Sequence, residues 1–229
     1  MTGTTTRKHD AQALEGLVTT RRGGRPSGLE SEQKRGQIID VATSLFFDQG
    51  YGATSIEAIA KQAGISKRTF YNRFRDKADL FGAVIHGIIG RIRPTDLAPL
   101  FEGGSFEEIL RRLADLALRA ALSPQAIALQ RLILAEANRF PELAQAVAAE
   151  GSKSEAIAHI TTLIARERSA GRLRLDDARF GAEQFLQMVI AVPQRRAMGL
   201  GTPMTGQELE LWGLDAVNLF LHGCRGWRS

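Results

Sequence analysis

Apolar residues recur at helical spacing along most of the chain, and no stretch alternates apolar and polar residues as a half-buried strand would. Glycine and proline residues interrupt this pattern, and Pro193 is expected to kink or end the regular part of its helix. The pattern therefore predicts an all-α protein. The expected helices span residues 31–49, 54–63, 67–74, 77–93, 105–122, 124–139, 141–170, 176–199 and 205–223.

The stretch from residue 54 to residue 77 carries a dense set of helix start and stop signals. Thr54 with Glu57 three residues later is typical of a capping box, so a helix is expected to begin there. Gly64 would end that helix, and Ser66 would cap a second, short helix over residues 67–74. Asp76 would cap the helix that follows. Two short helices joined by a glycine-containing turn predict a helix-turn-helix.

Charge indicates what this helix-turn-helix contacts. Residues 58–75 contain five cations and no acid. Phe70 and Phe74 lie four residues apart and are expected to pack inward, which leaves the basic side of the short helix in solvent. Cations on such a helix can bind phosphates, and arginine can pair with guanine in a major groove. The alternative is a solvated basic face, but the coincidence of caps, turn and charge favours DNA binding.

Residues 37–85 strongly resemble the DNA-binding domain of the TetR family of transcriptional regulators. The resemblance rests on I-I-D-V-A-T-S-L-F-F-D-Q-G-Y-G-A-T-S-I, I-A-K-Q-A-G-I-S, T-F-Y-N-R-F and D-K-A-D-L, in this order. Residues 131–144, R-L-I-L-A-E-A-N-R-F-P-E-L-A, resemble a C-terminal domain found in part of the family. The resemblance implies that the helix over residues 67–74 enters the major groove. The candidate DNA contacts are Arg25, Thr54, Ser55, Lys67, Arg68, Thr69, Tyr71, Asn72, Arg73 and Lys77, with Ser55 and Lys77 on phosphates.

The charge distribution supports a division of the chain. Residues 1–93 carry 15 Lys and Arg against 9 Asp and Glu, whereas residues 94–229 carry 15 against 16. We expect a flexible basic leader over residues 1–30, a helix-turn-helix domain over 31–80 and a helical ligand-binding and dimerisation domain over 81–229. In the leader, Gly24-Arg25-Pro26 resembles the core of an AT-hook. Arg21, Arg22 and Arg25 could therefore reach a narrow A·T-rich minor groove, or the leader could be a plain flexible segment.

The segment over residues 124–139 is apolar nearly all round, which predicts a buried helix. Its buried polar side chains would need partners, either an internal ion pair or a ligand. Ligand pockets are mostly apolar with a few polar groups, and they commonly lie between helices of a bundle. We expect a small, largely apolar effector there. The candidate polar contacts are Gln130, Arg131, Glu136, His159, Gln184 and Gln187.

The two C-terminal helices are apolar on more than one face, so one face can cover the protein's own core while another meets a partner. Two such helices from each chain could form a four-helix bundle, which is the arrangement the TetR family uses. The sequence thus predicts a homodimer. The candidate interface residues are Phe185, Met188, Val189, Val192, Leu209, Trp212, Val217 and Phe220.

Signals for other classes of protein are missing from the sequence. The four histidines show no metal-ligand spacing, and neither a nucleotide-binding loop nor a nucleophile elbow is present, so no metal or cofactor is expected. Cys224 is the single cysteine, and no apolar run is long enough for a membrane span, which favours a cytoplasmic protein. We expect a DNA-binding regulator, most simply a repressor released by an effector. The alternatives are a non-switching DNA-binding protein and, remotely, a small helical enzyme.

Overall fold

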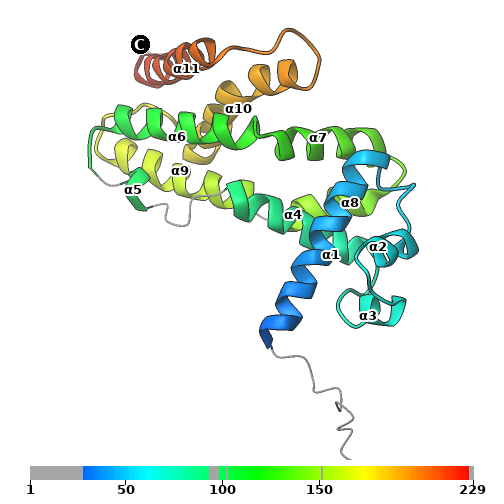
Figure 1. Ribbon diagram of the computed structural model, residues 1–229. Helices are drawn as coiled ribbons and strands as arrows, with labels where there is room; N and C mark the ends of the chain where they lie inside the picture. The colour runs from blue at the N-terminus through cyan, green and yellow to red at the C-terminus, as the bar shows by residue number, and fades with distance from the viewer. Residues whose placement is uncertain (1–27, 93–97, 102, 151, 227–229) are drawn as a thin grey trace, which may run out of the picture.

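The computed structural model describes residues 28–92, 98–101, 103–150 and 152–226, and every regular element within these ranges is an α-helix. The predicted all-α fold is confirmed (Figure 1). Arg21, Arg22 and Arg25 of the predicted leader lie outside the described residues. The helices are α1 (Gly28–Gln49), α2 (Ile56–Gln62), α3 (Lys67–Tyr71), α4 (Lys77–Ile92), α5 (Ala98–Phe101), α6 (Phe106–Ala121), α7 (Pro124–Glu136), α8 (Pro141–Glu150), α9 (Ser152–Ser169), α10 (Ala178–Ala197) and α11 (Gly206–Gly226).

Most of the expected start and stop signals of the helix-turn-helix operate as predicted. Ser66 accepts a hydrogen bond from the amide of Thr69 at 3.1 Å and caps α3. Asp76 accepts one from the amide of Asp79 at 2.8 Å, at the start of α4. Gly64 has a φ of 64°, in the left-handed region that ends a helix most readily with glycine. Each of these signals acts over a few residues, which is why the sequence reveals them.

The predicted cap of α2 is wrong by one residue. Ser55, not Thr54, is the N-cap, and its hydroxyl accepts from the amide of Ala58 at 3.1 Å. Thr54 is only 1 % exposed, and its hydroxyl donates to the carbonyl of Gly50 at 2.7 Å. Because Thr54 faces the core, its hydroxyl stabilises the loop that ends α1 instead of the first turn of α2.

The helix predictions differ from the structure in several places, and α3 ends at Tyr71, three residues before its predicted end. The single helix expected over residues 141–170 is two helices, α8 and α9, and the short α5 lies between residues 93 and 105, where the sequence pattern predicted no helix. Helix α10 continues past Pro193 to Ala197. Helix α7 is not buried all round, since Leu134 is 64 % exposed and only Ile127, Leu129 and Leu132 are buried. Apolar composition alone therefore overstated the burial of α7.

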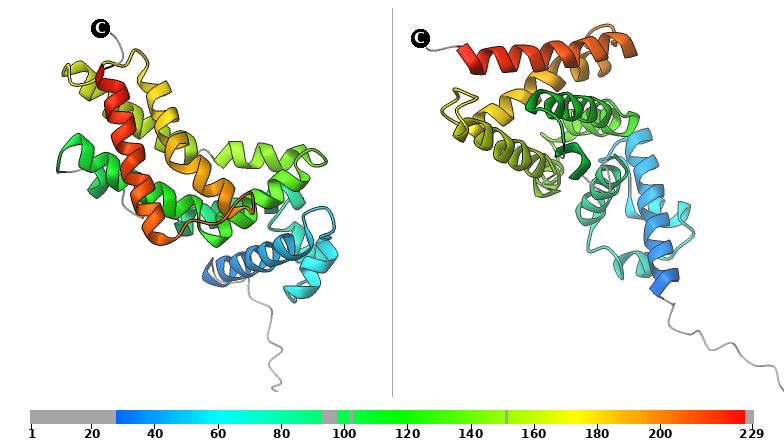
Figure 2. Two further views of the ribbon diagram at one scale, coloured as in Figure 1. Left: turned by 90° about the horizontal axis from the view of Figure 1, so that it is seen from above. Right: turned by 90° about the vertical axis from the view of Figure 1, so that its left-hand side faces the viewer.

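Two hydrophobic cores organise the helices. One lies between α6, α9, α10 and α11, and Leu110, Ile164 and Phe185 are fully buried in it or nearly so. The other lies among α1–α4 and includes Leu132 of α7 and Leu143 of α8, so these two helices cover the N-terminal helices directly. Helices α10 and α11 lie at the end of the molecule opposite α3 (Figures 1 and 2). The predicted domain limits near residues 30 and 80 stay predictions. The second core contains residues on both sides of residue 80, so it does not divide the chain there.

Candidate DNA-binding surface and effector cavity

Helix α3 presents a polar face above an aromatic base. Phe70 is fully buried and Phe74 is 2 % exposed, and their ring centroids lie 5.6 Å apart, which confirms the predicted inward packing. Tyr71 is 55 % exposed, and its ring meets the Phe70 ring edge-on at 5.4 Å. Lys67, Arg68 and Asn72 are also exposed. This face offers two cations, an amide and a phenol to a groove.

The two remaining α3 candidates are less accessible. Thr69 is half-buried, and its hydroxyl lies 2.9 Å from that of Ser66. Arg73 is half-buried as well, and its Nη1 donates to the carbonyl of Thr69 at 3.3 Å. Lys67 forms an ion pair with Glu57, and this hydrogen bond raises the pKa of Lys67 and lowers that of Glu57. Arg73 was expected to point outward, but its guanidinium folds back along α3.

Lys77 does not extend toward solvent as a phosphate contact would. Its ammonium donates to the carbonyls of Tyr51 and Thr54 at 2.8 and 2.9 Å, and it lies 4.2 Å from the centroid of the Tyr51 ring. Burial lowers the pKa of Lys77. The prediction that the Thr54 side chain binds DNA is wrong, because this side chain is buried and bonds within the loop of residues 50–55. A phosphate contact of Lys77 stays a prediction. Ser55 remains exposed, although its hydroxyl caps α2.

Residues 50–55, hereafter the α1–α2 loop, are also held from α7. The two carboxylate oxygens of Glu136 accept from the amides of Tyr51 and Gly52 at 2.7 and 2.6 Å. Glu136 was expected to contact a ligand or an internal cation. It does not line the cavity, whereas its charge acts on Lys77, whose pKa it raises against the effect of burial. Its isolated charge is satisfied by backbone amides about 85 residues earlier in the chain. The sequence contains no local signal for that pairing.

Tyr51 occupies the centre of this contact. It is 2 % exposed, and its ring packs against those of Phe46, Phe81 and Phe140, with ring centroids 5.2–5.4 Å from its own. Its hydroxyl donates to a carboxylate oxygen of Glu142 at 3.4 Å. Burial, followed by the charge of Glu142, raises the pKa of Tyr51 well above its ordinary value. Tyr51 thus joins the α1–α2 loop to α4 and to the segment between α7 and α8.

A cavity of about 400 Å³ lies among α4, α5, α6, α7, α9 and α10. Its wall is mainly aliphatic, with Ile88 and Ile89 from α4 and Ile133 from α7. The Phe101 ring lies 5.4 Å from the His159 ring, and His159 Nε2 lies 4.0 Å from a carboxylate oxygen of Glu155. The polar lining residues among those described are Gln130, Glu155, His159 and Gln194. This cavity suits a small, mostly apolar molecule with a few hydrogen-bonding groups.

The structure brings two of the six predicted ligand contacts, Gln130 and His159, to this cavity. Arg131 is exposed and donates to the carbonyl of Ala197 at 3.0 Å, outside the cavity. Gln184 and Gln187 are exposed on α10 and do not line it. Gln194 was missed, although it lies on the same helix two turns after Gln187. Polar type alone could not show which side of α10 faces inward.

The predicted dimer residues divide into two groups. Phe185, Val189, Val217 and Phe220 are buried in the chain's own core, so their assignment to the interface is wrong. Met188, Val192, Leu209 and Trp212 are half-buried, and the Trp212 indole donates to the carbonyl of Val189 at 2.9 Å. The large apolar side chains left exposed on these helices are Phe180, Leu211 and Leu219, which are 54–66 % exposed.

Two further properties bear on the class of protein. Within the described ranges, no group of three or more His, Cys, Asp and Glu side chains could hold a metal ion. No helix in the same ranges is both long and apolar enough to cross a membrane.

Curated regulators match about a quarter of the chain. AcrR from Shigella flexneri is 42 % identical over 60 residues, and FasR from Mycolicibacterium smegmatis is 40 % identical over 65 residues. These matches cover 26 and 28 % of this chain, and they span only 28 % of the length of either relative.

Solved structures match over most of the chain. A TetR-family transcriptional regulator from Mesorhizobium loti has a TM-score of 0.70 at 30 % identity, covering 84 % of this chain and 96 % of that one. The flavonoid-responsive regulator FrrA has the same TM-score and identity, with 86 and 100 % covered. The profile of the bacterial regulatory proteins of the tetR family matches residues 38–84. That of the AefR-like transcriptional repressor C-terminal domain matches residues 108–223, about half of the chain. The chain belongs to the TetR family of transcriptional regulators.

Proposed function

We propose that the protein is a homodimeric repressor that binds operator DNA through α3 and is released by a small, largely apolar molecule in the α4–α10 cavity. The observation that carries the DNA part is the exposed face of Lys67, Arg68, Tyr71 and Asn72 on a short helix with a buried aromatic base. Cations hold phosphates on such a face, and arginine reads guanine. The proposal includes a cytoplasmic location, because the protein must reach DNA.

The DNA part is tested by selecting duplexes from a random-sequence pool with the full-length protein. Arg68→Ala should lower the affinity for the selected duplex by about 5–150-fold, because a lost arginine–guanine contact costs roughly 1–3 kcal/mol. Arg174→Ala removes the same charge from an exposed site before α10 and serves as the control. Failure of the unaltered protein to enrich any duplex would contradict the proposal.

Dimerisation is supported by the surplus apolar surface on the last two helices. Phe180 of α10 and Leu211 and Leu219 of α11 are exposed on two helices that lie at one end of the molecule (Figure 1). Exposed apolar side chains that gather into one patch mark an interface. Two copies joined there would carry two α3 helices at their other ends, which suits half-sites about 34–36 Å apart or a multiple of that. Sedimentation of Leu211→Glu should show a monomer at micromolar concentration, where the unaltered chain is a dimer.

The switch is supported by the position of α4, which runs from the α1–α2 loop to the cavity. Lys77 at its first turn contacts the loop, whereas Ile88 and Ile89 near its last turn line the cavity. A molecule that tilts α4 would therefore move the helix-turn-helix. FrrA, a flavonoid-responsive regulator, is 30 % identical to this chain, which supports including flat aromatic compounds among the effectors tested.

Effectors are sought by thermal shift with a panel of apolar and aromatic compounds, and each hit is then tested for DNA release. Coupling of 1–3 kcal/mol would weaken DNA binding by about 5–150-fold, and bound DNA must lower the affinity for the compound by the same factor. Ala117→Leu, which fills part of the cavity wall, should reduce compound binding and leave DNA binding intact. A compound that binds equally well with and without DNA would favour the non-switching alternative.

A further inference from the structure

The α1–α2 loop is held by two of the helices that line the cavity, α7 and α4. From α7, the Glu136 carboxylate accepts from the amides of Tyr51 and Gly52 at 2.7 and 2.6 Å. From α4, the Lys77 ammonium donates to the carbonyls of Tyr51 and Thr54 at 2.8 and 2.9 Å. The loop's amides therefore depend on α7, while two of its carbonyls depend on α4.

The Glu136 contact is shaped for a carboxylate. Two successive amides that point the same way form a concave anion site, and hydrogen bonds to a charged acceptor are the shorter and stronger ones. Gly50 makes room for this contact with a φ of 88°, because a Cβ there would lie 2.4 Å from a Glu136 oxygen. At Gly52, a Cβ would lie 2.8 Å from the Phe140 ring. The loop backbone thus approaches α7 as closely as glycine allows.

Glu136 is joined by α7 to the cavity and by the loop to the helix-turn-helix. Leu129 and Ile133, about two turns and one turn before Glu136, line the cavity. On the other side, Gly52 lies three residues before Ser55, the N-cap of α2. A displacement of α7 relative to α4 would therefore change how the loop sets the direction of α2 and α3.

We propose that Glu136 is a positioning residue for DNA recognition, acting from outside the helix-turn-helix. Its carboxylate keeps the α1–α2 loop on α7 and so sets the orientation of α3 relative to the rest of the molecule. A shift of α7 at the cavity reaches α3 through this contact, in addition to any tilt of α4. The inference rests on the proposed DNA-binding function.

The test measures the effect of one substitution, Glu136→Gln, on the affinity for two duplexes. The full-length protein and its Glu136→Gln variant are titrated with a selected duplex carrying both half-sites and with a duplex carrying one. Gln cannot accept from both amides in the same way, so exchange of the Tyr51 and Gly52 amides should speed up. Affinity for the two-half-site duplex should fall about 5–150-fold, the usual range of coupling between sites. Affinity for the single half-site should change much less, since one α3 can still dock alone.

Glu107→Gln is the charge-matched control, because Glu107 is on α6 and pairs only locally with Arg111. It should leave both affinities unchanged. Should Glu136→Gln fail to fold, Glu136→Asp keeps a carboxylate on a shorter side chain. This variant should also lose more affinity for the two-half-site duplex than for the single half-site, by a smaller factor. Equal losses on both duplexes, or no loss on either, would overturn the inference. Failure of the unaltered protein to bind either duplex would instead contradict the proposed function.

Discussion

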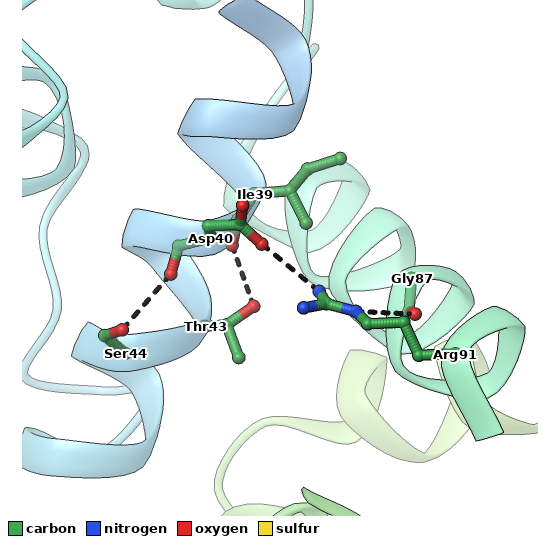
Figure 3. Close-up of polar contacts among 6 residues, drawn as sticks. All are labelled: Ile39, Asp40, Thr43, Ser44, Gly87 and Arg91. Carbon is green, nitrogen blue, oxygen red and sulfur yellow. Dashed lines mark hydrogen bonds and ion pairs between the residues drawn. The ribbon is translucent and has the colours of Figure 1, made fainter. Parts of the chain in front are cut away.

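The two ends of α4 are attached to the N-terminal helices in different ways. At the first turn, the Lys77 ammonium is half-buried, donates to two loop carbonyls and faces the Tyr51 ring. At the last turn, Arg91 Nη2 lies 3.2 Å from a carboxylate oxygen of Asp40 on α1 (Figure 3). The side chains of this second pair are 59 and 66 % exposed, and Arg91 also donates to the carbonyl of Gly87 in its own helix at 3.2 Å.

The difference shows where α4 is anchored. An exposed ion pair is screened by solvent and stabilises a fold by about 0–1 kcal/mol. Groups bonded away from solvent cost more to separate, because each partner is left without a hydrogen bond. The polar contacts of α4 are therefore stronger at the α1–α2 loop than at the end beside the cavity, where Ile85 and Ile88 hold the helix by apolar packing instead. A tilt of α4, which the proposed switch requires, would therefore carry the α1–α2 loop with it.

The largest effect is expected from Gly50→Ala in the anchoring loop. The residue has a φ of 88°, and its new Cβ would lie 2.4 Å from a Glu136 oxygen, so both backbone strain and a broken carboxylate contact result. We expect a loss of about 2–4 kcal/mol in the free energy of unfolding, measured with urea. Gly64→Ala is the matched control, because Gly64 also has a positive φ but open space around it. Equal losses for the two changes would mean that the Glu136 contact adds nothing.

Lys77→Met should have the next largest effect. Methionine keeps most of the aliphatic stem but cannot donate to the carbonyls of Tyr51 and Thr54. The free energy of unfolding should fall by about 1–3 kcal/mol, since two partly buried acceptors lose their donor. Lys61→Met removes the same charge from an exposed position on α2 and should change stability little. If both variants behave alike, the first turn of α4 is no better anchored than its last.

Tyr51→Phe should matter chiefly at alkaline pH. Burial raises the pKa of Tyr51 above its ordinary value of 10.0, so between pH 10 and the folded pKa the unfolded chain loses a proton that the folded chain keeps. Stability contributed by this group is present below pH 10 and lost as pH rises, by about 1.4 kcal/mol per pH unit. The phenylalanine variant should lack this part of the alkaline decline. Tyr71→Phe, at the exposed tyrosine on α3, should keep it.

The smallest effect is expected from Asp40→Asn at the other end of α4. Loss of the exposed pair with Arg91 should lower the free energy of unfolding by less than about 1 kcal/mol, and less still at high salt. Urea unfolding at low and high ionic strength measures both quantities. A loss as large as that of Lys77→Met would reverse the comparison between the two ends of the helix.

The sequence by itself predicted the features that local chemistry specifies. Ser66, Gly64 and Asp76 delimit the helix-turn-helix because each cap is satisfied within about one turn of chain. Phe70 and Phe74 mark the inner face of α3 because residues four apart share a helical face. The basic, exposed character of that helix followed from the same spacing. These features required no knowledge of what packs against the helix from elsewhere.

Only the tertiary structure decided the partners of polar groups and the use of apolar faces. Glu136 bonds to amides 84 and 85 residues away, and no spacing rule connects them. Phe185 and Phe220 lie in the core while Phe180 and Leu219 remain exposed, although all four belong to helices that are apolar on several sides. Periodicity identifies a face of a helix, but the three-dimensional packing of the other helices determines what covers that face.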